Sequence, residues 1–574
     1  MDSNLFKTKS IEQLVGDVEH GSKALRRSLT AWDLTLLGIG AIIGTGIFVL
    51  TGTAAANQAG PAIMMSYFAA GLACTFAALC YAEFASMIPI AGSAYTYAYA
   101  TLGEVVAWMI GWDLILEYAV GSMTVAIGWS GYMQRLIAGF GIELPTWMTT
   151  APPVGVINLP ATIIVLGIMV LLVVGVRESA RFNAAMVAIK GAAILFFIAA
   201  GATFVKPDNW SPFMPYGFSG VMAAAAVVFF AYIGFDAVST TAEEAKNPQR
   251  DLPIGIIASL IICTLLYLLV SAVLSGIVPV VHYRNAADAL PGVPSVSPTE
   301  AQAFLNAPVA FALSVINQDW AAALISAGAV AGITSVLLVM LMSQPRIFFA
   351  MSRDRLLPPG VSKVHPRFGT PYITTIITCV IVALVAGLTQ IQVVGEMTSI
   401  GTLFAFVVVC AAVLRLRQTR PDARRPFRVP FGPIFPILGI VSCAYLMLSL
   451  PVLTWVRFLV WLDIGLLIYW FYGRTHSPLS DQQEAAKRTP LQSLANLITI
   501  FGLLLVFNAA CITILGYMTE FGVTTETLAK WSELSQLGID VTADEADSFG
   551  LRFLLVAVSV WVVGFGLTKA SGEK

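Results

Sequence analysis

The segment Gly38–Phe48 combines four glycines with an apolar run that contains no charged residue. A glycine costs about 1 kcal/mol relative to alanine inside a helix, so a simple membrane anchor would not need so many. Gly40 and Gly44 fit close packing of helices through small residues. The triplet Gly44-Thr45-Gly46 fits an unwound segment better, because freed backbone groups within a membrane must face a cavity and a polar ligand. We therefore predict a break in this helix.

A second break is predicted within Phe229–Ala237, where Asp236 follows Gly234 in an apolar stretch. Placing an ionisable residue inside a membrane span costs free energy, and such residues normally have a function. The half-helix that starts after Gly46 would present free N–H groups and the positive end of its dipole, which favour an anion. The carbonyl groups that end the preceding half-helices would favour a cation. A site that binds an anionic group next to a cationic group suits a zwitterion. This indicates an α-amino acid ligand.

Three charged residues inside predicted spans need an explanation. Lys190 lies about nine residues beyond Arg181, roughly 13 Å from the end of its span, which is deep for a lysine that snorkels to the interface. A lone lysine at that depth must have a partner, and the carbonyls freed by the first break are available. Asp113 and Glu117 share one helix face at i and i+4. Glu117 either reaches the ligand side chain or makes a hydrogen bond between helices.

The elements that must position these residues are membrane spans. The chain has 574 residues, of which 57% are apolar and 11% are charged, and its net charge is −1. Soluble proteins carry about 25% charged residues. This composition excludes a soluble enzyme, a disordered chain and a nucleic-acid binder. The cysteines lie in apolar runs and the histidines are scattered, so we expect no metal site and no cofactor.

The apolar stretches predict an all-α polytopic membrane protein with about fourteen helices. Gly60-Pro61 divides the first charge-free run into two helices. The polar stretch Asn285–Ala307 is expected to be an external loop, with a short helix at Pro298–Leu313. The predicted spans lie near residues 34–59, 61–82, 103–134, 158–176, 182–205, 217–243, 253–280, 320–350, 371–389, 397–414, 431–451, 454–473, 491–517 and 551–568.

The distribution of basic residues predicts the orientation. With the amino terminus inside, 25 of the Lys and Arg side chains fall on cytoplasmic segments and 6 on external ones. Both termini are therefore expected in the cytoplasm of a cell-membrane protein. A broken first and a broken sixth helix imply two inverted halves of five helices with a site at the midplane. We expect a cytoplasmic segment 1–30, a ten-helix transport core 31–418, helices eleven and twelve at 419–475, and a linker with two additional helices at 476–574.

Several long motifs resemble one family. They are "CYAEFASMIPIAGSAYTYAYATLGE" from Cys80, "FFAYIGFDAVSTTAEEAKNPQRDLP" from Phe229, "QPRIFFAMSRDRLLP" from Gln344 and "RRPFRVP" from Arg424. Over about residues 25–475 the chain resembles the amino acid–polyamine–organocation (APC) superfamily, and within it the cationic amino acid transporter family. The resemblance implies the leucine-transporter-like (LeuT-like) fold, a 5+5 inverted repeat.

The resemblance also implies roles for the residues of the two breaks. The substrate carboxylate would meet the N–H groups of Gly44, Thr45 and Gly46. The substrate ammonium would meet the carbonyls of Ile42, Phe230, Ala231 and Ile233. The Phe230 ring would close over the substrate as an outer gate, although simple packing explains it equally well. Asp236 would bond across the break to the first helix, through Thr45 or water.

Other roles concern coupling, gating and selectivity. In sodium-coupled members of this fold, a sodium ion lies near the position that Lys190 would occupy. An ammonium there could replace the ion, and loss of its proton could release the first helix. Glu83 is expected to serve an inner gate. An apolar wall containing Met340 on the eighth span would crowd a long arginine side chain.

We therefore expect a secondary transporter that imports L-amino acids with protons along the transmembrane gradient, favouring a small neutral substrate such as alanine. Transport of arginine, lysine or ornithine by uniport or exchange stays open because Glu117 is present. A membrane sensor is the alternative of another class, but it would need a larger soluble domain. An enzyme is not expected, since the spans carry no nucleophile–base pair or nucleotide loop. The sequence leaves open a small accessory membrane subunit.

Overall fold

The computed structural model describes residues 8–9, 29–88, 93–174, 180–284, 296–368 and 370–477. The chain divides into two units, Met1–Met447 and Leu448–Lys574. Over the described residues the regular secondary structure is helical, with one isolated bridge between Leu29 and Ala245. The expected spans near 491–517 and 551–568 lie outside the described residues, as does most of the segment 1–30.

The described residues include eight helices that are long and apolar enough to cross a membrane, and four shorter apolar helices. Together they cover the first twelve stretches that the sequence predicts, which confirms an all-helical polytopic membrane protein. The long segments, two of which are interrupted at Gly60 and at Ile233, are Gly46–Met87, Glu104–Ala138, Ala184–Ala202, Gly217–Ser239, Pro248–Ile277, Asp319–Arg353, Ile391–Thr419 and Leu453–His476. The shorter ones are Ala31–Ile42, Leu159–Val174, Tyr372–Leu388 and Ile434–Leu448.

The first predicted break is present. Helix α2 (Ala31–Ile42) begins at a Thr30 cap and ends at Ile43, whose backbone is extended. The chain resumes as a widened helical turn, η1 (Gly46–Leu50), which continues into α3 (Thr51–Ala54). Gly60 then takes a positive φ of 62° ahead of α4 (Ile63–Met87), so Gly60-Pro61 separates two helices as expected.

The second predicted break is present as well. Helix α9 (Gly217–Val228) tightens into the short turn η6 (Phe229–Tyr232) and stops at Ile233, whose ψ of 135° leaves the helical region. Gly234 has a φ of 116°, a conformation that residues with a side chain rarely adopt. The chain continues as α10 (Ala237–Thr240). Glycine is thus required at this position to turn the backbone.

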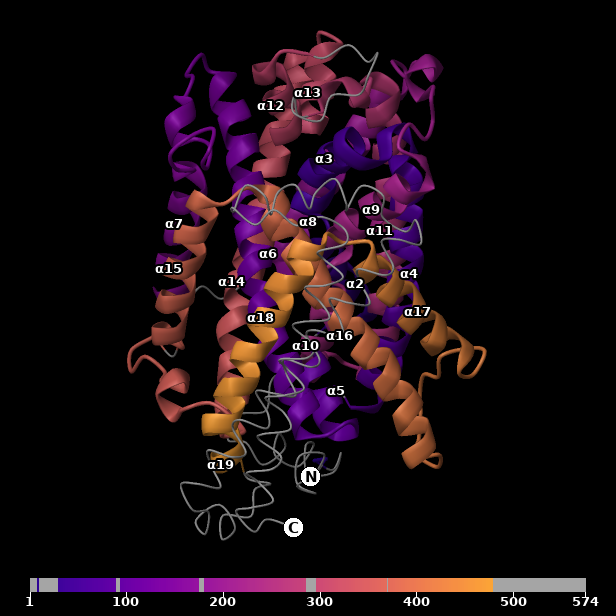
Figure 1. Ribbon diagram of the computed structural model, residues 1–574, viewed down its shortest axis with the longest axis vertical. Helices are drawn as coiled ribbons and strands as arrows, with labels where there is room; N and C mark the ends of the chain where they lie inside the picture. The colour runs from indigo at the N-terminus through magenta and orange to yellow at the C-terminus, as the bar shows by residue number, and fades with distance from the viewer. Residues whose placement is uncertain are drawn as a thin grey trace, which may run out of the picture. The chain divides into compact units, whose positions relative to one another are not determined.

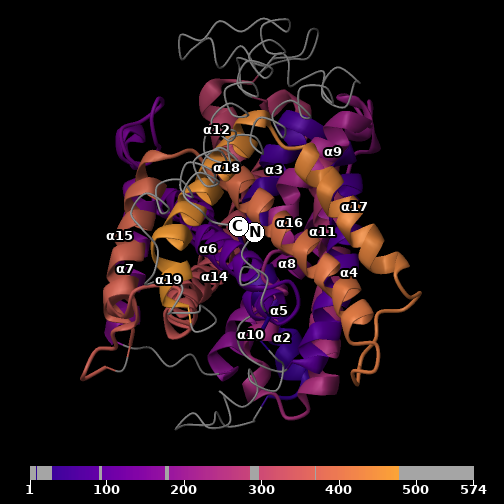
Figure 2. The ribbon, with the colours of Figure 1, turned by 60° about the horizontal axis from the view of Figure 1, so that its bottom comes forward.

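The two broken helices are surrounded by long continuous ones. Within the first unit, α6 (Glu104–Ala138) packs along α14 (Asp319–Arg353) and α16 (Ile391–Thr419). Helix α2 packs against α8 (Ala180–Ala202) and α11 (Pro248–Ile277). Helices α7 (Leu159–Val174) and α15 (Tyr372–Leu388) lie side by side in both ribbon views (Figures 1 and 2).

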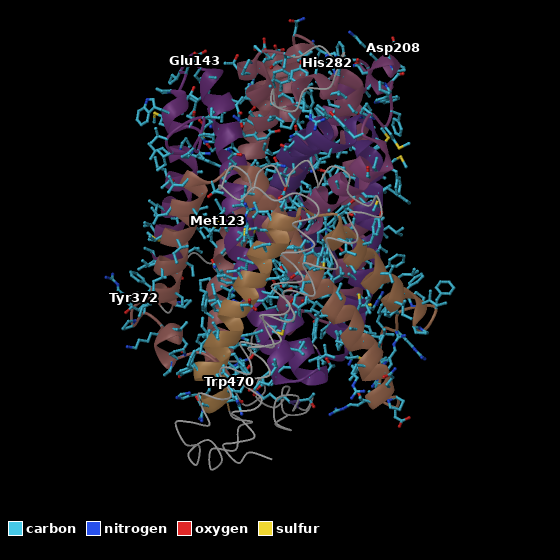
Figure 3. All side chains as sticks on the ribbon, viewed as in Figure 1. Met123, Glu143, Asp208, His282, Tyr372 and Trp470 are labelled. Carbon is cyan, nitrogen blue, oxygen red and sulfur yellow. The ribbon has the colours of Figure 1, made fainter. Side chains whose placement is uncertain are left out.

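Short helices lie at the two ends of this first unit. Helices α12 (Pro298–Asn306) and α13 (Pro308–Val315) lie at one end and α5 (Ser93–Thr101) toward the other (Figure 1). The polar loop residues Glu143, Asp208 and His282 lie at the end that carries α12 and α13 (Figure 3). The short helix expected at Pro298–Leu313 is therefore two helices that meet at Ala307.

Candidate functional site

The two breaks cross each other in the interior of the first unit. A Cβ atom added to Gly46 would overlap the backbone and the methyl group of Ala231. A Cβ atom added to Gly234 would lie 2.9 Å from the carbonyl carbon, the carbonyl oxygen and the Cβ of Ala41. Each broken helix therefore places a glycine against the backbone of the other, and the missing side chains allow this close approach.

The crossing brings together the residues that were predicted to bind the ligand backbone. Thr45 is fully buried, and Ile42, Phe230, Ala231 and Ile233 are at most 4% exposed. The first N–H groups of a helix and the last carbonyl groups have no partner within that helix. The turn that begins at Gly46 therefore offers donors, while the ends of α2 and η6 offer acceptors. This arrangement can hold one anionic and one cationic group at the same place.

Tyr267 on α11 joins the two acceptor segments, a role that the sequence analysis missed. Its hydroxyl lies 2.9 Å from the carbonyl oxygen of Ile42 and 2.8 Å from that of Ala231. One hydroxyl has one proton to donate, and each carbonyl oxygen has two lone pairs, so both carbonyls keep acceptor capacity. The available signal was a lone tyrosine in an apolar span, since a buried tyrosine hydroxyl usually has a polar partner.

Lys190 is fully buried and has the partners that were expected. Its ammonium donates hydrogen bonds to the carbonyl oxygens of Gly40 and Ile43, the latter at 3.0 Å. The aliphatic stem lies against Gly332 of α14, where an added Cβ would be 2.9 Å from the Cβ of Lys190. A cation on α8 thus holds the end of α2 at the break and packs between α2 and α14.

Asp236 also lies in the second break, where its own turn supplies polar partners. The carboxylate lies against backbone N–H groups of its own turn, between Gly234 and Ala237, and the residue is 3% exposed. The hydroxyl of Thr45, one of the two routes expected from Asp236 to the first helix, donates to the carbonyl oxygen of Val125 at 3.4 Å. Backbone N–H groups thus stabilise the carboxylate locally, and its two oxygens keep further acceptor capacity. The expected bond across the break, through Thr45 or water, stays a prediction.

Two further carboxylates lie nearby on α6. Asp113 is fully buried, and neither of its oxygens has a hydrogen-bond partner among the described residues. Its carboxylate faces Gly401 of α16, where an added Cβ would be 2.7 Å from Oδ1. Glu117 is 2% exposed and lies beside Thr402, while its Oε1 has no partner within the described part of the chain. These oxygens can accept hydrogen bonds from a ligand, or a carboxylate can take up a proton.

The eighth predicted span contributes an apolar wall, with one residue that the sequence analysis missed. The atoms nearest to a Cβ added at Gly44 all belong to Val336, the closest at 3.2 Å. Met340 lies one turn further along α14 and packs against Gly121 of α6, with its sulfur 3.4 Å from a Cβ added there. Val336 precedes Met340 by four residues, so the spacing of one helix face could have identified it.

Aromatic side chains fill the space between the second break and α5. Phe235 packs against Phe406 with ring centroids 5.0 Å apart and against Tyr81 at 5.7 Å. Tyr81 also contacts Tyr97 of α5. This aromatic cluster, Tyr81, Tyr97, Phe235 and Phe406, closes the interior on the α5 side. Phe230, the expected outer gate, is buried and 4% exposed.

Two carboxylates, those of Glu83 and Asp354, form ion pairs that join elements on the α5 side. Glu83 on α4 accepts hydrogen bonds from Arg417 of α16 and from the backbone N–H of Val429 at 2.8 Å, and Arg425 lies 3.4 Å away. Lys9 pairs with Asp354 at 3.4 Å, and Tyr95 of α5 donates to the same carboxylate at 2.7 Å. The partners of Glu83, which was expected to serve an inner gate, are thus residues far away in the sequence.

No group of three or more His, Cys, Asp or Glu side chains suited to a metal ion occurs among the described residues. The six cysteines described are buried and form no disulfide bond: Cys74, Cys80, Cys263, Cys379, Cys410 and Cys443. Among the described residues, the polar groups around the two breaks include the helix ends, Lys190, Asp236, Glu117 and Tyr267.

Comparison with known proteins adds independent information. The family model described as amino acid permease matches residues 29–472. A methylthioribose transporter of Bacillus subtilis is 49% identical over 83% of this chain and all of its own length. The branched-chain amino acid permease BcaP of the same organism is 50% identical over 84% of this chain and all of its own. The vacuolar cationic amino acid transporter 4 of Arabidopsis thaliana is 32% identical over 83% of this chain and 97% of its own.

Proposed function

Because the chain belongs to the amino acid permease family of the APC superfamily, we propose that it is a proton-coupled secondary transporter that imports L-amino acids. The main support for this proposal is the contact between the two breaks at Gly46 and Ala231. It supports a LeuT-like inverted repeat in which helices one and six are broken. The substrate carboxylate binds the N–H groups of Gly44, Thr45 and Gly46, and the ammonium binds carbonyls of Ile42, Phe230, Ala231 and Ile233.

The substrate class that fits best is a neutral, apolar amino acid. Val336 lies against Gly44, and Met340 follows one turn later, so the α14 side of the site is apolar. A small side chain such as that of alanine fits this wall. The 50% identical relative named as a branched-chain amino acid permease extends the candidates to valine, leucine and isoleucine.

A cationic substrate is the second candidate, favoured by the unpartnered oxygens of Asp113 and Glu117. A guanidinium or ammonium group would satisfy them by charge-assisted hydrogen bonds. The 32% identical relative named as a cationic amino acid transporter agrees with this alternative. Met340 would have to move aside for so long a side chain.

Coupling and gating follow from the residues around the breaks. The Lys190 ammonium holds Gly40 and Ile43 of the first broken helix, so loss of its proton would release that helix. Phe230 closes the outer side, while the aromatic cluster and the Glu83 ion pairs close the side of α5. On this proposal that side and both termini are cytoplasmic, and the protein lies in the cell membrane, as the distribution of Lys and Arg predicts.

The test is uptake into proteoliposomes by the purified protein, with and without an inside-alkaline gradient. The panel contains labelled alanine, leucine, arginine and methylthioribose, in sodium or in potassium buffer. We expect gradient-driven, sodium-independent uptake of alanine or leucine. Uptake of methylthioribose alone, or strict sodium dependence, would overturn the proposal.

A further inference from the structure

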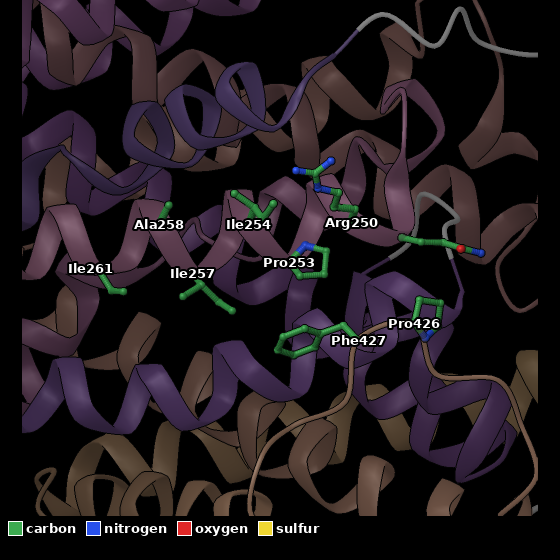
Figure 4. Close-up of a pocket in the computed structure, with 9 residues that line it drawn as sticks. Arg250, Pro253, Ile254, Ile257, Ala258, Ile261, Pro426 and Phe427 are labelled. Atoms are coloured by element: carbon green, nitrogen blue, oxygen red, sulfur yellow. The ribbon is translucent and has the colours of Figure 1, made fainter.

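Helix α11 carries a groove on the face that it turns away from the other helices. The groove has a volume of about 610 Å³ and is lined by Arg250, Pro253, Ile254, Ile257, Ala258 and Ile261 of this helix. These positions repeat at helical spacing along one face. Pro426 and Phe427, from the segment between α16 and α17 (Ile434–Leu448), form the opposite wall (Figure 4).

Polar groups occur at one end of the groove only. Arg250 lies at one end of the row and Ile261 at the other (Figure 4). Ile254 and Ile261 are 42% and 52% exposed, and Arg250 is exposed as well. Neighbouring arginines are already paired, since Arg417 and Arg425 bind Glu83. The guanidinium of Arg250 makes no hydrogen bond or ion pair with any residue that the structure describes.

The nearby charges favour an anion at this end. The Asp251 carboxylate is buried on the other face, where it accepts from the backbone N–H of Asn247 at 3.1 Å. Arg428 follows Phe427 and is exposed. From Arg250 to Ile261 the helix rises roughly 16 Å, about half of a hydrocarbon core of ~30 Å. The groove therefore has the length of one leaflet, a cationic mouth and an apolar floor.

We propose that this groove binds an anionic phospholipid, with the phosphate at Arg250 and an acyl chain along Ile254, Ile257 and Ile261. A basic mouth on a membrane-spanning groove is suited to an anionic headgroup. Lys246, four residues before Arg250, is joined to the segment that precedes α2. Its backbone N–H donates to the carbonyl oxygen of Leu29 at 2.8 Å, and the N–H of Leu29 donates to that of Glu244 at 3.0 Å. A lipid bound at Arg250 would therefore lie close in sequence to the backbone contact that joins the start of α2 to the segment after α10.

Native mass spectrometry of the full chain, delipidated and titrated with phosphatidylglycerol or phosphatidylcholine, tests this site without relying on transport. We expect the first phosphatidylglycerol to bind about fivefold more tightly than phosphatidylcholine, the factor expected for one arginine near a membrane surface. Arg250→Gln should abolish the preference, whereas Arg415→Gln, which removes another exposed arginine on α16, should keep it.

A second pair of variants tests the apolar floor. Ile257→Trp should fill the groove and weaken the binding of both lipids, while Ile381→Trp on the exposed face of α15 should not. Equal binding of the two lipids to the wild-type protein would overturn the proposal, as would equal effects of the two arginine variants. Efficient cross-linking between two copies through Ile257→Cys would also overturn it, because a second copy would then occupy the groove.

Discussion

Gly46 lies directly against the backbone of Ala231, so the second half of one broken helix touches the end of another. The reciprocal contact joins Gly234 to Ala41. Neither contact leaves room for a side chain. Donor groups from one helix and acceptor groups from the other can therefore converge on one small ligand.

Substituting Gly46 should block transport, and substituting Gly44 should impair it. Gly46→Val would force the two helices apart, and Gly44→Ala would press on the side chain of Val336 at 3.2 Å. We expect uptake by Gly46→Val to fall to background, and uptake by Gly44→Ala to be partly restored by a second change, Val336→Ala. Uptake is measured per protein at the membrane. Gly167→Val, where an added side chain meets open space, is the control, and normal transport by Gly46→Val would refute the site.

Lys190→Ala should uncouple transport from the proton gradient. The ammonium is bonded to the carbonyl oxygens of Gly40 and Ile43, which are not among the groups predicted to bind the ligand. We expect amino acid binding to weaken by no more than about tenfold, ~1.4 kcal/mol, while accumulation driven by an inside-alkaline gradient is lost. Lys206→Ala, at an exposed loop position, should behave as wild type. Undiminished pH-driven accumulation by Lys190→Ala would contradict the assignment.

Asp236→Asn should lower the rate of transport more than it lowers the amount of protein in the membrane. The carboxylate lies against the N–H groups of the turn from Gly234 to Ala237, and an amide would offer those donors a weaker acceptor. A hydrogen bond to a charged group is worth about 1.5–3 kcal/mol, so a decrease in rate of roughly tenfold or more is expected. Asp208→Asn in an exposed loop is the matched control. Wild-type rates at every pH would show that Asp236 is only structural.

Met340→Ser should change selectivity and not only activity. The shorter side chain widens the apolar wall, and Glu117 stays in place to meet a cationic side chain. We expect the affinity for arginine relative to alanine to rise about tenfold, the scale typical of a change in pocket size. Competition of unlabelled arginine against labelled alanine measures this ratio. Met65→Ser, at a 39% exposed position, should leave it unchanged; an unchanged ratio in Met340→Ser itself would place Met340 outside the site.

The sequence predicted both breaks because glycine clusters and a membrane-embedded aspartate are local signals. It also predicted carbonyl partners for Lys190, since a buried ammonium must be satisfied and only the first break offers free acceptors. The partners of Glu83 could not be found in this way, because Arg417 lies 334 residues further along the chain. The satisfaction of Asp236 by its own turn depends on backbone geometry that spacing alone does not reveal.

Tyr267 and Val336 were missed in the sequence for a different reason. Both lie on continuous helices, α11 and α14, whose sequences have no break to attract attention. Their importance comes from which helix face meets the crossing, and that depends on how the helices pack. Tertiary packing therefore decides which ordinary apolar or aromatic residue becomes part of the site.

The central claim is that the crossing at Gly46 and Ala231 binds both charged ends of an amino acid. The most direct measurement is equilibrium binding of labelled L-alanine to the purified protein, in competition with L-alanine, its methyl ester and N-acetyl-L-alanine. We predict that the two blocked compounds compete at least about tenfold less well than L-alanine, because each has lost one of the charged groups. Equal competition by either blocked compound would contradict the account.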